Sequence, residues 1–280
     1  MDFDINQPLN GVRPFAATNP NLVAINQLNS SGTSNYNSLQ TSIRQSNWHG
    51  ITANVNYTWG RSMDFVSSVT TPMNSYNLRD DYGPSIFDIR NTLTGFVTYN
   101  VPQFGHYLPA LTRGWQLNNL FTFSGGTPIN VIIGSNRSGS FQNKDRPDLV
   151  TGASPLAGRI PLVTASARTV QYLNRAAFDT STASIPAGTF GNLGRYAFYG
   201  PGLGSDDFSI FKNTRIGERI DTQLRGEIYN IANQANYANP NATLSSSSFG
   251  QLTSTRNGGS APGLGFGEPR NVQLALKVSF

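Results

Sequence analysis

A two-residue alternation of apolar and small polar side chains runs through this chain in blocks of about ten residues. The clearest block is 51–59, ITANVNYTW, where apolar and aromatic residues take the odd positions and Thr or Asn takes the even ones. Because successive side chains of a β-strand point to opposite faces, such a block has one apolar face and one polar face. The alternation predicts β-strands, and helical periodicity is scarce.

The final stretch repeats the pattern, with Val272, Leu274, Leu276, Val278 and Phe280 on one face and Gln273, Ala275, Lys277 and Ser279 on the other. Further strands are expected at residues 92–101, 115–123 and 220–229, and weaker ones at 36–45 and 207–213. The pattern therefore predicts an all-β, antiparallel chain of about seven or eight strands.

The connections between these blocks alternate in length. Tight turns are expected at 46–50 and 213–218, and a connection of intermediate length at 101–114. Long stretches rich in Gly, Ser, Asn and Pro occupy about 61–88, 134–204 and 233–269, and their composition predicts a poor core. Short turns on one side and long loops on the other are typical of a transmembrane β-barrel. If the last strand runs toward the periplasm, every long loop falls outside the cell and both tight turns fall inside.

Composition agrees with a wall that has lipid on one side and water on the other. Charged residues make up 12% of the chain, about half the usual share of soluble domains. There is no cysteine, which excludes disulfide scaffolds and thiolate metal sites. The net charge is +5, but Lys and Arg are scattered, which argues against nucleic acid as a partner. No apolar run is long enough for a transmembrane helix.

Aromatic residues at the ends of the predicted strands favour two membrane interfaces, where Trp and Tyr are enriched. The expected girdle residues are Tyr57, Trp59, Tyr99, Trp115 and Phe280. Trp59 falls at an outer end, and Tyr99, Trp115 and Phe280 fall at inner ends. The alternative is that these residues form the core of an ordinary β-sandwich.

Charged residues within the strands are expected to face the lumen, because a charge on the lipid face costs a few kcal/mol at mid-bilayer. These residues are Asp88, Arg90, Asp221, Arg225, Glu227 and Lys277. A structural ion pair between neighbouring strands is the simpler interpretation, and a role in substrate passage is the alternative.

No pattern in the chain indicates an enzyme. His49 and His106 are its two histidines, and neither has a second ligand at metal spacing. No Gly-x-Ser-x-Gly elbow is present. We therefore expect no catalytic, cofactor-binding or metal site.

Beyond these patterns, the chain resembles the Oar-like TonB-dependent transporters of Gram-negative outer membranes over nearly all of its length from about Arg13. The downstream motifs are DFSIFK (207–212), GER (217–219), LRGEIYNIAN (224–233), NYANP (236–240), FG (249–250) and EPRNVQLALKVSF (268–280). The upstream motifs are SNYNSLQ (34–40), YTWGR (57–61), DIR (88–90), GWQL (114–117) and SGGTP (124–128). Four short motifs match the long extracellular loop, namely AF (177–178), FGN (190–192), GR (194–195) and GPG (200–202). Each motif is weak by itself, and their common order makes the match specific.

The resemblance implies the C-terminal part of a 22-stranded outer-membrane barrel. Residues 1–35 would form a loop with a partial strand, and 36–280 the barrel wall. The implied partners are outer-membrane lipid, the remaining barrel strands and plug of the parent protein, the TonB complex acting through that plug, and the barrel-assembly machinery. The last strand, from Val272 to Phe280, resembles the signal that this machinery reads.

Three functions follow as hypotheses. The first is the barrel wall of a TonB-dependent transporter, incomplete alone, since neither a plug nor a signal peptide is visible near Met1. The second is a self-contained small outer-membrane barrel that acts as an anchor or adhesin. The third is a secreted β-sandwich that binds carbohydrate. Small polar inward positions favour the wide lumen of the first hypothesis.

Overall fold

The computed structural model describes residues 2–8, 10–67, 71–105, 108–163, 168–181, 183, 185–256 and 266–280. The strands of the main sheet are β3 (Ser34–Trp48), β4 (Ile51–Asp64), β5 (Gly83–Pro84), β6 (Asn91–Asn100), β7 (Trp115–Ser124), β14 (Leu203–Ile216), β15 (Ile220–Tyr229) and β17 (Asn271–Ser279). The shorter strands are β1 (Asp2–Asp4), β2 (Asn26–Leu28), β8 (Pro128–Ile129), β9 (Asp148–Leu149), β10 (Leu156–Val163), β11 (Arg168–Leu173), β12 (Phe178–Asp179), β13 (Phe198–Tyr199) and β16 (Gln251–Leu252). The helical turns are η1 (Leu78–Asp81), α1 (Pro109–Thr112) and η2 (Arg175–Ala177).

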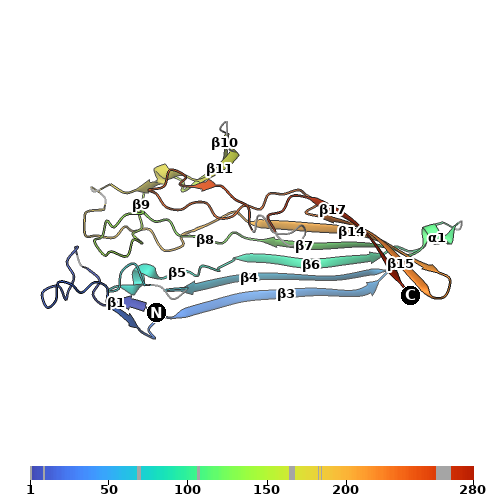
Figure 1. Ribbon diagram of the computed structural model, residues 1–280, viewed down its shortest axis with the longest axis horizontal. Coiled ribbons are helices and arrows are strands. Elements are labelled where there is room, and N and C mark those ends of the chain that lie inside the picture. The colour runs from blue at the N-terminus through green and yellow to red at the C-terminus, as the bar shows by residue number, and fades with distance from the viewer. Residues whose placement is uncertain are drawn as a thin grey trace.

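The main sheet is an antiparallel meander. Its order is β17-β15-β14-β7-β6-β4-β3, with β5 paired to β4 beside this path. Each long strand therefore pairs with the next long strand along the chain, and Figure 1 shows them running side by side along the long axis of the molecule. The predicted all-β antiparallel fold is confirmed.

Long and short connections lie at opposite ends of the sheet. The β3–β4, β6–β7 and β14–β15 connections lie at the same end as the C-terminus, and the long loops extend from the other end (Figure 1). Strand β3 continues to Trp48, so the expected turn at 46–50 narrows to His49 and Gly50, both at positive φ as a two-residue hairpin turn requires. The second turn is shorter than the expected 213–218 and lies at 217–219, because β14 continues to Ile216 and β15 begins at Ile220.

The strands also extend beyond the alternating blocks at their outer ends. β4 continues to Asp64, past the expected start of a loop at 61, and β14 begins at Leu203, before the expected strand at 207–213. The hydrogen bonds between strands join backbone groups and do not depend on side-chain polarity. A strand can therefore continue beyond the membrane, where its side chains no longer need to alternate between apolar and polar.

We call the described residues of the three long connections, 65–90, 125–202 and 230–270, the cap. The expectation of a poor core in the long loops is wrong, because a buried hydrophobic cluster joins two of these connections. Its members are Ile129, Val131, Leu173, Ala177, Phe178, Leu193, Leu244 and Phe249. Phe178 contacts Phe198 and Phe249 edge-to-face at centroid distances of 5.8 and 5.7 Å. The described parts of the connections after β7 and β15 thus pack together, and apolar residues from distant segments become a core.

The N-terminal segment 1–35 contains two short strands, β1 and β2, that pair with each other. Asp4 is buried there and accepts a hydrogen bond from the backbone N–H of Ile25 at 3.0 Å. Gln7 reaches into the cap and donates to the carbonyl oxygen of Met73 at 2.7 Å. The described residues of this segment before Ser34 therefore lie at the loop end of the molecule, and residues 34–35 begin β3 of the main sheet.

Candidate functional site

One face of the main sheet is apolar across all seven strands of the meander. The register aligns Ile43, Val55 and Gly95 across β3, β4 and β6, and Leu224 with Leu276 across β15 and β17. The other apolar-face members are Leu39, Ile51, Ala53, Leu93, Val97, Leu117, Phe121, Phe123, Phe208, Ile210, Ile220, Ile228, Val272, Leu274 and Val278. Many of these side chains are exposed. An apolar face of this extent marks a surface that meets another apolar phase.

Aromatic residues border this face at both ends. The register places Tyr57 and Trp59 of β4 opposite Leu93 and Asn91 at the outer end of β6. Tyr99 and Trp115 lie at the inner ends of β6 and β7. Phe280 follows β17 in the same parity and is fully exposed. Its role as an assembly signal stays a prediction.

Two inner-end residues of the apolar face were missed in sequence. Trp48, after a break in register, pairs with Ile51 and is exposed. Lys212 lies opposite Trp115, with its Nζ 5.8 Å from the Trp115 ring centroid and donating to the carbonyl oxygen of Arg113 at 2.7 Å. Two features of the sequence could have identified them. Trp48 directly precedes a tight turn, and Lys212 is separated from Phe208 and Ile210 by even numbers of residues, which places it on the same face.

The opposite face is polar. Register pairs place Asp221 opposite Ser279, Arg225 opposite Ala275 and Glu227 opposite Gln273, with Lys277 opposite Gln223. These four charged residues share the face with Thr, Asn, Ser and Gln from β4, β6 and β7. The sheet therefore separates most of its polar and apolar side chains, with Phe96, Leu120 and Phe211 as apolar exceptions on the polar face. Asn119 and Asp206 are polar exceptions on the apolar face. That the polar face lines a lumen stays a prediction.

The comparison with known families agrees with this two-faced sheet. Residues 2–273 match a family whose description is "Outer membrane beta barrel domain". The chain belongs to this outer membrane β-barrel domain family. No curated protein matches the chain. Among the described residues, no helix is long and apolar enough to cross a membrane. Such a domain requires an apolar side that faces lipid, and we expect the apolar face to be that side. The protein is an outer-membrane protein.

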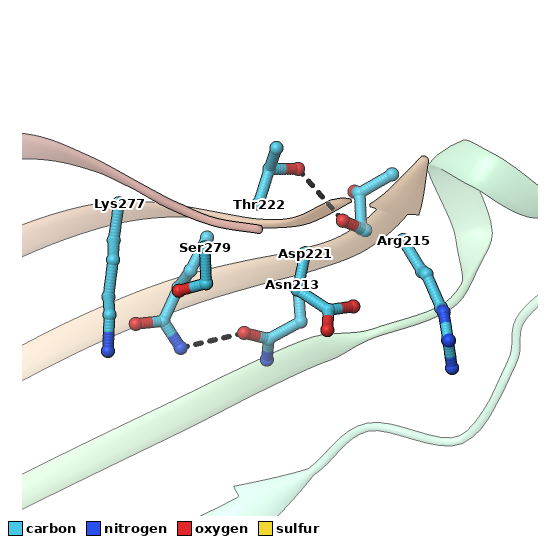
Figure 2. A pocket seen from close by; sticks show the side chains of 8 residues that line it. Asn213, Arg215, Asp221, Thr222, Lys277 and Ser279 are labelled. Carbon is cyan, nitrogen blue, oxygen red and sulfur yellow. Dashed lines mark hydrogen bonds between the residues drawn. The ribbon is translucent and has the colours of Figure 1, made fainter. Parts of the chain in front are cut away.

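At its inner end, the polar face of this outer membrane domain is hollowed between β14, β15 and β17 (Figure 2). The hollow has a volume of about 400 Å³ and includes Arg215, Asp221 and Lys277. Gln223 donates a hydrogen bond to Asn213 Oδ1 at 2.7 Å. Charges of both signs line this hollow, and its arrangement indicates a hydrated wall rather than a selective site.

Asp88 and Arg90 lie just before β6, at the base of the cap rather than on a strand face. Asp88 is 2% exposed and pairs with Arg90 at 3.1 Å. Tyr199 donates to Asp88 Oδ2 at 2.5 Å and accepts from Arg90 Nε at 2.9 Å. Burial and then the hydrogen bond to Asp88 raise the pKa of Tyr199, so this phenol stays protonated as a donor at neutral pH. The sequence could indicate the Asp88–Arg90 pair, but not its third member 109 residues after Arg90.

Of two further ion pairs, one joins two loops of the cap and the other joins the cap to β4. Arg146 Nη1 lies 2.6 Å from Asp81 Oδ1, and Arg195 pairs with Asp64 at the end of β4. Lys144 donates to the carbonyl oxygen of Thr71 at 2.5 Å, and burial lowers its pKa. These contacts join the loop after β4 to the loop after β7.

Within the described part of the chain, no group of three or more His, Asp or Glu side chains could hold a metal ion. His49 lies in the β3–β4 turn, 4.8 Å from the Trp48 ring in an edge contact. His106 lies outside the described residues.

Trp115→Ala should lower the free energy of unfolding in lipid vesicles by about 1–2 kcal/mol. The substitution removes the Trp115 Nε1 hydrogen bond to the carbonyl oxygen of Leu111 at 2.7 Å and the contact with Lys212. Urea titration followed by fluorescence measures the change. Gln116→Ala, on the opposite face, is the matched control and should change it by less than about 0.5 kcal/mol. Equal losses for the two variants would contradict the girdle assignment of Trp115.

Proposed function

We propose that these strands form part of the wall of a TonB-dependent transporter, which moves an unidentified substrate across the outer membrane and has no catalytic role of its own. A plug supplied by the parent protein would close the lumen, and the TonB complex would act through that plug. The order of motifs that resembles Oar-like transporters supports the TonB part of this proposal.

The parity of the sheet carries the larger-barrel part of the proposal. The path from β3 to β17 has seven strands that alternate in direction, so β3 and β17 run the same way. Single-chain outer-membrane barrels of bacteria have an even number of antiparallel strands. Joining β3 to β17 directly would require a parallel pair. Unpaired edges cost several kcal/mol per backbone group in hydrocarbon, so additional strands are needed to close the wall.

The polar face supports a wide lumen. Thr, Asn, Ser and Gln occupy most of its positions on β4, β6 and β7. A barrel of about eight strands fills its interior with side chains, whereas larger barrels leave space for water, a plug or a substrate. Short polar side chains suit the larger barrel.

Expression with an added signal peptide tests the larger-barrel proposal. The chain alone should be degraded and should show no heat-modifiable band on a semi-native gel. Co-expression of the parent protein's upstream strands should restore a folded, protease-resistant species. A heat-modifiable monomer formed by the chain alone would contradict the proposal and favour a self-contained anchor or adhesin.

Growth assays test the TonB part separately. Deletion of residues 34–280 from the parent protein and inactivation of TonB should abolish uptake of the same substrate among iron chelates, vitamins, oligosaccharides and peptides. A substrate whose uptake needs these strands but not TonB would contradict it.

A further inference from the structure

A second hollow lies at mid-height on the polar face, where β6, β7, β14 and β15 meet. Its volume is about 330 Å³, within the range of small-molecule sites. Side chains that project from the polar face into this region include Phe96, Leu120, Asp207, Glu227 and Tyr229.

Phe96 and Leu120 depart from the composition of this face. The other polar-face positions of β6 and β7 are Thr, Asn, Gln and Ser. Phe96 and Leu120 are direct Cα partners across the two strands, and their exposed fractions are 40% and 57%. Two adjacent exposed apolar side chains on a polar wall form an apolar contact surface, which is a common sign of a binding site.

Two carboxylates stand beside this apolar pair. Asp207 is the Cα partner of Leu120, and Glu227 is the partner of Ser209, so the two acidic residues occupy diagonal positions on neighbouring strands. Asp207 Oδ1 accepts from the backbone N–H of Asn230 at 2.8 Å, and Glu227 Oε2 accepts from the Tyr229 hydroxyl at 3.2 Å. Neither acid belongs to the four ion pairs of the described residues.

The nearest cation of β15 is turned away from these acids. Arg225 shares the polar face two residues before Glu227, but its guanidinium lies 5.0 Å from the Phe211 ring centroid and its Nε donates to Gln223. No cationic side chain of the described residues forms an ion pair with Asp207 or Glu227. A cation that arrives from outside would therefore meet two carboxylates that no ion pair neutralises.

We propose that this hollow binds a small ligand in which an ammonium or guanidinium group lies beside an apolar group. The cation would pair with Asp207 and Glu227, and the apolar group would cover Phe96 and Leu120. The ring of Tyr229 offers a further cation–π contact. This inference rests on the proposed transport function, because it needs the polar face to line an open lumen.

Calorimetric titration tests the proposal on the full protein in detergent, with N-acetyl-phenylalanyl-arginine amide as the probe. The double variant D207N/E227Q should weaken binding about tenfold, because it removes charge-assisted hydrogen bonds. Phe96→Thr, which adopts the residue type usual on this face, should also weaken binding. Asp221→Asn is the matched control, since Asp221 is a carboxylate on the same face near the inner end of β15, and it should leave binding unchanged.

The probe has its own control. Citrulline in place of arginine removes the charge at nearly constant shape, and it should weaken binding to the natural protein but not to D207N/E227Q. Absence of binding by the natural protein, equal affinity for the two probes, or equal losses in D207N/E227Q and D221N would overturn the proposal. Docking of a plug segment in the hollow would appear as probe binding only after the plug is removed, and would also overturn it.

The semi-native gel separates the two proposals. Each variant is first required to show the heat-modifiable band of the full protein. A self-closing chain on that gel would refute the larger barrel whatever the probe does, whereas failed binding with the gel unchanged would refute the ligand site alone.

Discussion

Val55→Arg is expected to lower the free energy of unfolding of the barrel by about 2–4 kcal/mol, enough to remove most of the folded protein from the outer membrane. Val55 lies on the apolar face of β4, midway between Ile51 at the inner end and Trp59 near the outer one. Its Cα partners are Ile43 and Gly95, so no neighbour offers a counter-ion. The guanidinium would stand in hydrocarbon at the depth where a charge costs most.

Asn56→Arg is the matched control, because Asn56 is the next residue and points to the polar face between Ser42 and Thr94. This variant should insert normally and change the free energy of unfolding by less than about 1 kcal/mol. Urea titration in vesicles and the amount of heat-modifiable protein in cells measure both variants. If Asn56→Arg were the more damaging change, the two faces would have to be exchanged, and with them the assignment of the lipid side.

Arg146→Ala is expected to open the cap while leaving the membrane strands folded. Arg146 is 2% exposed and Asp81 is 3% exposed. Besides this ion pair, Arg146 donates to the carbonyl oxygens of Leu193 at 2.8 Å and Asp80 at 2.5 Å. Its removal breaks the ion pair of the buried Asp81, which costs about 3–5 kcal/mol.

The loss should be local, because the Arg146 contacts join loop to loop and none of them reaches the main sheet. Limited proteolysis of whole cells should cut within the cap, near η1 and residues 134–202, while the heat-modifiable band persists. The double variant Asp81→Ala/Arg146→Met should recover part of the loss, because no unpaired charge remains buried. Loss of the band in Arg146→Ala would show instead that the cap and the strands fold as one unit.

Local pattern was sufficient to predict the strands. In residues 51–59 and 272–280 the side chains alternate between apolar and polar. This period-2 alternation predicted both the strand and the face on which each residue of these blocks lies. The order of short and long connections then predicted strands of alternating direction, which the meander has. The direction of each strand relative to the membrane stays a prediction. The ends of strands were less predictable, as β3 and β14 show, because outside the membrane backbone pairing continues without that constraint.

The cap could not be predicted by the same reasoning. Leu193 and Leu244 are isolated apolar residues in stretches rich in Gly, Ser and Asn, and no period marks them. Arg195 meets Asp64 from 131 residues away. Such contacts depend on where three loops are brought together by the strands that carry them.

The sequence by itself thus determined the antiparallel strands and the two faces of the regular blocks, because the polarity of alternate side chains is set residue by residue. Only the tertiary structure decided that the loops share a core with buried ion pairs, that Lys212 lies against Trp115, and that Phe96, Leu120, Asp207 and Glu227 meet in one hollow. These features arise from the register between strands and from packing between distant segments. Neither the register nor the packing can be predicted from the polarity pattern of a single block.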